Sequence, residues 1–81
     1  MAQHTTDENV LGKIENLVHE EQRLYGQANL ADHDQLRLEQ IKVELDQCWD
    51  LLRQRRARRE FGQDPDGAAV RPASVVERYE Q

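Results

Sequence analysis

Apolar residues follow a helical period between residues 7 and 25. Members of this stripe are four and three residues apart in turn, with one acidic exception: Val10, Ile14, Leu17, Glu21 and Leu24. A second apolar row, Leu11, Val18 and Tyr25, runs beside it at intervals of seven. Such spacing is typical of an amphipathic helix, and two rows make the apolar face broader than a strict coiled-coil seam. The pattern predicts a helix over residues 7–25 that ends at Gly26.

A longer apolar stripe belongs to a second helix, predicted over residues 32–61. Its members again alternate three and four apart: Leu38, Ile41, Leu45, Cys48 and Leu52. Asp32 stands where an N-cap would stand, and no glycine or proline follows until Gly62. At about 1.5 Å per residue, this helix is much longer than the first and must extend past it. Residues 26–31 form the expected connection.

The two stripes can be aligned as an antiparallel hairpin. Pairs whose residue numbers sum to 62, such as Leu17 with Leu45, then bring apolar positions together. The same register places Arg55 near Asp7. The sequence therefore predicts an all-α fold, an antiparallel two-helix hairpin with a long second helix.

Beyond the hairpin, residues 62–81 are predicted to form a turn and a C-terminal tail. Residues 64–67, Asp-Pro-Asp-Gly, have the order of a type I turn. Residues 68–72 are expected to be extended because they lead into a proline. Ser74 can cap a short helix over residues 74–80. Two states remain open for this tail, either frayed or docked on the hairpin through its apolar side chains, Val75, Val76 and Tyr79.

At the other end, residues 1–6 are expected to be disordered, with Thr5 and Glu8 forming a capping box for the first helix. These residues hold neither the basic cluster nor the apolar run of a signal peptide, and no window reaches the roughly 18 apolar residues of a membrane span. The single cysteine, Cys48, favours a reducing compartment. We therefore expect a cytoplasmic protein without membrane contact.

Some apolar residues of the second helix point away from the first. Leu36 and Val43 are a heptad apart on that side, and Leu51 also lies off the seam. A single hairpin would leave such residues exposed, whereas a second copy or the C-terminal tail could cover them. We favour a homodimer in which two hairpins form a four-helix, coiled-coil-like arrangement.

Charge is distributed unevenly along the 81 residues, whose net charge is −5. Residues 1–52 carry −7, residues 53–59 carry +5 and residues 60–81 carry −3. We call residues 53–59 the arginine-rich segment, after its five basic side chains: Arg53, Arg55, Arg56, Arg58 and Arg59. Because these guanidinium groups repel one another, anions must lie close to them.

Three sources of those anions are open. We favour the chain's own carboxylates, which would be Asp7, Glu8, Asp50, Glu60, Asp64 and Asp66. A protein partner and nucleic acid are the alternatives. The five arginines point around most of the helix, whereas a helix that reads nucleic acid concentrates its contacts on one face, so nucleic acid is not favoured.

Candidate chemistry is sparse elsewhere. For Trp49, core or interface packing is favoured over cation–π contact with Arg53. Cys48 has no nearby histidine to activate it, and the three histidines lack the spacing of a zinc site. No catalytic triad or glycine-rich phosphate loop is present, so we expect no enzyme, no cofactor and no metal.

One long stretch of the sequence is distinctive. Residues 44–60 read ELDQCWDLLRQRRARRE, and Asp64-Pro65 and residues 75–79, VVERY, follow. With this signature the chain resembles a family of short actinobacterial proteins of unknown function. The resemblance spans most of the chain and implies that the arginine-rich segment and the tail belong to the working unit. It implies no catalytic residue, cofactor or partner.

Two functions fit these observations. The first is a non-catalytic interaction or scaffold protein, acting as a homodimeric helical hairpin through Leu36, Val43, Trp49 and the arginine-rich segment. The second is a nucleic-acid-associated accessory protein that contacts phosphates through residues 53–59.

Overall fold

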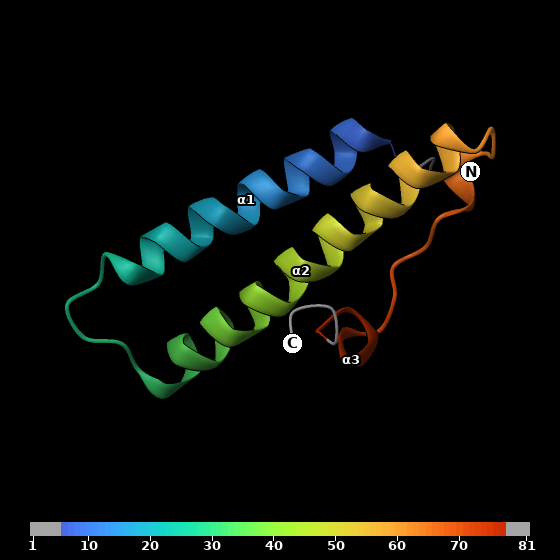
Figure 1. The fold of residues 1–81 in the computed structure, drawn as a ribbon. Coiled ribbons are helices and arrows are strands. Elements are labelled where there is room, and N and C mark those ends of the chain that lie inside the picture. Colours follow the sequence, from blue (N-terminus) through green and yellow to red (C-terminus); the bar gives the residue numbers. More distant parts are fainter. Residues whose placement is uncertain (1–5, 78–81) are drawn as a thin grey trace, which may run out of the picture.

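The computed structural model describes residues 6–77, and every regular element among them is helical (Figure 1). The elements are α1 (Asp7–Tyr25), α2 (Asp32–Glu60), the 3₁₀ helix η1 (Pro65–Gly67) and α3 (Ala73–Val76). α1 and α2 lie antiparallel, and the chain after α2 turns back along it (Figure 1). The predicted all-α hairpin, with its long second helix and short helical tail, is confirmed.

The hairpin is held together mainly by the two predicted stripes, but Leu51, which we placed off the seam, also belongs to the core. Its buried residues are Val10, Ile14, Leu17 and Leu24 from α1, and Leu38, Ile41, Cys48 and Leu51 from α2. Ile41 is completely buried, whereas Leu45 and Leu52 are only partly covered at the edge of the core. The Nε of Arg55 lies 2.6 Å from Oδ1 of Asp7, so these two residues meet as the register requires.

The helix caps differ slightly from those expected. Thr6, not Thr5, caps α1, because its hydroxyl oxygen accepts a hydrogen bond from the N–H of Asn9 at 3.1 Å. Thr5 lies outside the described residues. α2 begins after Ala31, whose N–H donates to the Asp34 carboxylate at 3.3 Å. A carboxylate in the first turn also interacts favourably with the helix dipole.

The C-terminal part turns sharply after α2. Gly62 has a φ of +71°, a conformation that glycine adopts without strain and that commonly ends a helix. A 3₁₀ turn, η1, forms where the type I turn was predicted, and the Asp64 carboxylate caps it by accepting from the N–H of Asp66 at 2.9 Å. Both η1 and α3 pack against α2.

The tail is docked rather than frayed as far as Glu77. α3 begins after Pro72, so Ser74 lies inside the helix instead of capping it. Val76 is only 2% exposed, whereas Val75 is 39% exposed. Tyr79 and the remainder of the helix predicted over 74–80 lie outside the described residues.

Candidate interaction surfaces

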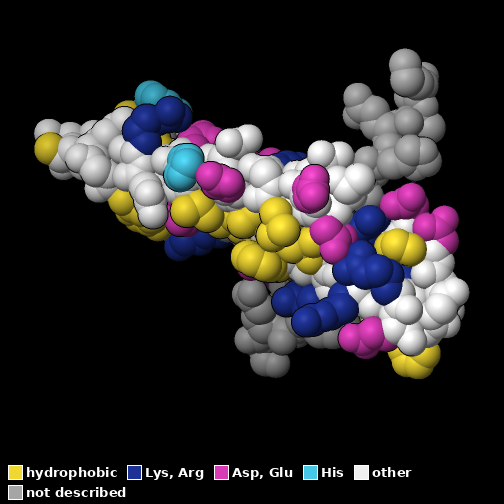
Figure 2. Space-filling view, turned by 90° about the horizontal axis from the view of Figure 1, so that it is seen from above, with side chains coloured by type: hydrophobic (Ala, Val, Ile, Leu, Met, Phe, Trp, Pro, Cys, Tyr) yellow, Lys and Arg dark blue, Asp and Glu magenta, His cyan; other side chains and the backbone are white. Residues whose placement is uncertain are grey.

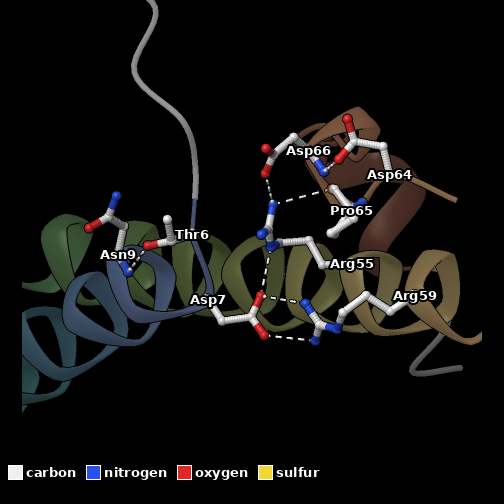
Figure 3. A network of polar contacts seen from close by, with 8 residues as sticks. All are labelled: Thr6, Asp7, Asn9, Arg55, Arg59, Asp64, Pro65 and Asp66. Atoms are coloured by element: carbon white, nitrogen blue, oxygen red, sulfur yellow. Dashed lines mark hydrogen bonds and ion pairs between the residues drawn. The ribbon is translucent and has the colours of Figure 1, made fainter.

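Arg55 is the structural centre of the arginine-rich segment (Figure 3). It is 5% exposed. Its Nε donates to Asp7 of α1, and its Nη1 donates to the Asp66 carboxylate at 2.9 Å and to the carbonyl of Pro65 at 3.2 Å. The Asp7 carboxylate raises the pKa of Arg55, with a smaller contribution from Asp66. One guanidinium thus joins α1, α2 and η1.

Arg59 completes this network, because it donates to both oxygens of Asp7, at 3.2 and 2.7 Å. The pKa of Asp7 is lowered, mainly by the hydrogen bonds from Arg59 and then by those from Arg55. Arg58 lies against Gly67, where an added Cβ would come within 2.6 Å of its Nη1. Arg55 and Arg59 therefore pair with the chain's own carboxylates, as we favoured from the sequence.

Arg53 and Arg56 behave differently. Both side chains are exposed, and neither forms an ion pair with a carboxylate of residues 6–77. They line a groove of about 340 Å³ together with other side chains from both helices: Asp7, Trp49, Leu52 and Arg59. We call this the arginine groove. Trp49 is 46% exposed, so it is not a core residue.

We expected Asp50 to pair with the arginine-rich segment, but its ion pair is with Arg71 of the tail. Arg53 lies beside the two in a surface pocket without forming an ion pair with Asp50. Asp50 is 1% exposed and accepts hydrogen bonds from Nε and Nη2 of Arg71 and from Gln54, the latter at 2.9 Å. Arg71 lowers the pKa of Asp50 more than any other group does. Gln54 also donates to the carbonyl of Ala69, at 2.9 Å, and Gln47 donates to that of Arg71.

We call these contacts of Gln47, Asp50 and Gln54 with Ala69 and Arg71 the tail latch. We did not predict the tail latch from the sequence, although the sequence holds a signal for it. Gln47, Asp50 and Gln54 recur three and four apart, which places them on one side of α2 together with Leu51. Leu51 is 6% exposed. The off-seam row of α2 is thus covered by the tail over this part of the helix.

One side of the hairpin is not covered by residues 62–77 of the tail. On the tail side, Asn9 and Lys13 of α1 share a surface pocket with Gln47, Leu51 and Val70. The other flank of α1 carries the row Leu11, Val18 and Tyr25. Asp7 lies on the same flank, because it is four residues before Leu11, and Asp7 lines the arginine groove with Trp49. We call this row, together with the partly buried Leu45 of α2, one turn before Trp49, the open face.

The open face leaves large apolar side chains in contact with solvent. Leu11 is 47% exposed and Tyr25 is 56% exposed. Val18 and Leu45 are partly buried against the core. Figure 2 shows hydrophobic side chains in a band along the hairpin that meets a cluster of basic side chains.

Leu36 and Val43, our candidate interface residues, lie on a different side of α2. Leu36 is 60% exposed and Val43 is half-buried. They line a groove of about 480 Å³ whose other walls are polar or charged: Arg37, Glu39, Gln40 and Glu44. Arg37 bridges Glu20 at 2.7 Å and Glu44 at 2.9 Å, which raises its pKa, mainly through Glu20.

The remaining candidate chemistry is limited. Cys48 is buried, and burial raises the pKa of its thiol, which keeps the thiolate scarce. In the described part of the chain, no cluster of three histidine, cysteine or acidic side chains could hold a metal ion. Neither is there a helix within residues 6–77 with enough length and apolar character to span a membrane.

Comparison with known proteins identifies relatives over nearly the whole chain. A family described as "Protein of unknown function (DUF2630)" matches residues 6–81. Uncharacterised proteins of Mycobacterium tuberculosis strain H37Rv and Mycobacterium bovis are each 50% identical to this chain, over 91% of it and 90% of their own length. No solved structure matches. The predicted resemblance to actinobacterial proteins of unknown function is confirmed.

Proposed function

We propose that this chain, which belongs to the DUF2630 family of proteins of unknown function, is a non-catalytic interaction protein that forms a homodimer through its open face. The observation that carries the proposal is the exposure of an apolar row at heptad spacing. Leu11 and Tyr25 lie at its two ends and remain about half exposed in the single chain. An extended apolar surface of this kind marks an interaction site on a small soluble domain.

A second copy of the chain suits this surface because both long helices contribute to it. Two hairpins packed face to face through a two-fold axis would form a four-helix arrangement. The row Leu11, Val18 and Tyr25 has the seven-residue repeat with which helices interlock side chains across such an interface. Because Leu11 and Tyr25 are already about half covered in the single chain, burial of the remainder of each side chain would contribute about 1 kcal/mol before the cost of association.

The side of α2 that carries Leu36 and Val43 supports a dimer less well. Charged and amide side chains border its groove, and Arg37 is already engaged with two glutamates of the same chain. The tail also occupies the same side of α2 further along, through Gln47 and Asp50. A partner helix laid along this side would have to pass the tail.

Nucleic-acid association is the second candidate. Its support is that Arg53 and Arg56 are free to meet phosphates beside the exposed ring of Trp49. The net charge of −5 opposes it, because the whole chain repels a long polyanion. A retardation assay at low salt with duplex DNA, single strands and RNA tests it.

Light scattering coupled to size exclusion tests the dimer. We expect twice the mass of one chain for the wild type and the mass of one chain for a Leu11→Glu/Tyr25→Glu variant. Leu36→Glu/Val43→Glu is the control, since it places two glutamates seven residues apart on the other exposed apolar side. A wild type that stays monomeric at high concentration contradicts the proposal, and dissociation by Leu36→Glu/Val43→Glu alone moves the interface to that side.

A further inference from the structure

We infer that the arginine groove binds an acidic segment of a partner protein, with carboxylates on Arg53 and Arg56 and an apolar side chain against Trp49 and Leu52. This inference rests on the proposed function in one respect, that the chain is an interaction protein, and it names the chemistry of its partner. It does not depend on the open face being the dimer interface.

The charges of the groove are not balanced by carboxylates of residues 6–77. The five guanidinium groups of the arginine-rich segment have only two ion-pair partners among residues 6–77, Asp7 and Asp66. Asp7 already accepts hydrogen bonds from Arg55 and Arg59. Three positive charges are therefore left over, and they favour an anionic ligand at the exposed pair of Arg53 and Arg56.

The shape of the groove suits carboxylates that are close together. Arg53 and Arg56 are three residues apart on α2, which corresponds to about 4.5 Å along the helix axis. A guanidinium presents a planar fork of donors that matches a carboxylate in a bidentate pair. Two neighbouring acidic side chains of one short segment can reach both arginines.

Trp49 adds a reason to expect a protein. A half-exposed tryptophan beside arginines that form no ion pair among residues 6–77 has the composition of the residues that dominate protein interfaces. Leu52, partly covered by the core, extends the apolar wall of the same groove. The groove thus offers an apolar contact between charged ones, which an acidic segment containing one leucine or similar residue would fill.

A single-stranded nucleic acid fits the same groove less well. Stacking platforms for bases use several aromatic rings, whereas Trp49 is the one aromatic side chain among the described residues that line this groove. Acidic side chains border the basic cluster (Figure 2), so the positive surface is short. A short acidic segment can bind without approaching these bordering acidic side chains, whereas a long phosphate backbone would lie close to them and be repelled.

Intrinsic fluorescence offers a local test, because Trp49 is the only tryptophan of the chain. The probe is a capped synthetic peptide in which glutamates flank a leucine, and the control peptide has glutamines in place of the glutamates. We expect a saturable fluorescence change with the acidic peptide alone, weakening as salt rises. Arg53→Gln/Arg56→Gln should weaken binding about tenfold, whereas Arg23→Gln, an exposed arginine of α1, should not.

Several results would overturn the inference. They are an absent or non-saturable signal, equal binding of the glutamine peptide, and unchanged binding by the Arg53→Gln/Arg56→Gln variant. A single-stranded oligonucleotide that binds more tightly than the acidic peptide would overturn it in favour of nucleic acid. Repeating the titration with Leu11→Glu/Tyr25→Glu separates the two proposals, since mass reports the dimer and fluorescence reports the groove.

Discussion

The C-terminal tail should lose much of its attachment when Arg71 is replaced by glutamine. Arg71 donates two hydrogen bonds to Asp50, one of them from Nε at 2.9 Å. Asp50 is almost completely buried, and its remaining contact in this network is the hydrogen bond from Gln54. Removing the guanidinium therefore leaves a buried carboxylate without its hydrogen-bonded counter-charge, and only the weaker electrostatic attraction of Arg53 remains.

The size of the effect follows from burial. Breaking a fully buried ion pair from one side costs about 3–5 kcal/mol, and a hydrogen bond to a charged group contributes about 1.5–3 kcal/mol. Here the Arg71 side chain is 34% exposed, and the tail can lift so that water reaches Asp50. We therefore expect a loss of about 2 kcal/mol in the free energy of unfolding for Arg71→Gln.

A double-mutant cycle with Asp50→Asn measures the coupling directly. Urea unfolding followed by circular dichroism gives the four free energies, and we expect a coupling energy of about 1.5 kcal/mol. Arg56→Gln is the matched control, since it removes an exposed arginine of the same helix that has no ion pair among residues 6–77 and should change stability by less than about 0.5 kcal/mol. A coupling energy near zero, or an Arg71→Gln variant as stable as the control, would refute the reasoning.

Three further predictions concern the hairpin. Ile41→Ala should cost about 3 kcal/mol in urea unfolding, because Ile41 is fully buried. Asp7 and Asp50 have lowered pKa values in the folded state, so both carboxylates stabilise the fold fully above their unfolded pKa of about 4. This stabilisation is lost as the pH falls through the folded pKa values. The urea midpoint should therefore drop at acid pH, and it should drop less in Asp50→Asn. Gly62→Ala should cost about 1 kcal/mol, measured as a fall in the thermal midpoint, because of its positive φ, whereas Gly26→Ala, at φ −76°, should not.

The hairpin could be predicted because its information is periodic. Two apolar stripes of matching spacing determine which sides of α1 and α2 meet, and their register then places Arg55 beside Asp7 without any knowledge of the tail. The caps were displaced by about one residue, because neighbouring threonines and aspartates compete for the same orphan N–H groups. The period of apolar residues therefore predicts that a helix forms more reliably than it predicts the residue at which the helix begins.

The tail latch could not be predicted in the same way. Asp50 and Arg71 are separated by 21 residues, a 3₁₀ turn and an extended stretch, so no local pattern joins them. Each arginine could pair with any of several acidic residues, and which pair forms depends on the path of the chain after Gly62. The same limit applies to Leu36, Val43 and Leu51, which all lie off the seam. The sequence does not show how far along α2 the tail reaches, so it cannot tell which of the three the tail covers.

The tail matters to the proposed interactions because it decides which side of α2 remains available. α1 covers one side of this helix, and the tail covers another through Gln47, Asp50 and Gln54. Along this part of α2, the described residues leave Trp49, Arg53 and Arg56 exposed, and this is the side that we propose a partner contacts. The arginines of one segment therefore divide by position: replacing Arg55 should damage the fold, since it ties three elements together, whereas replacing Arg53 and Arg56 should damage only binding.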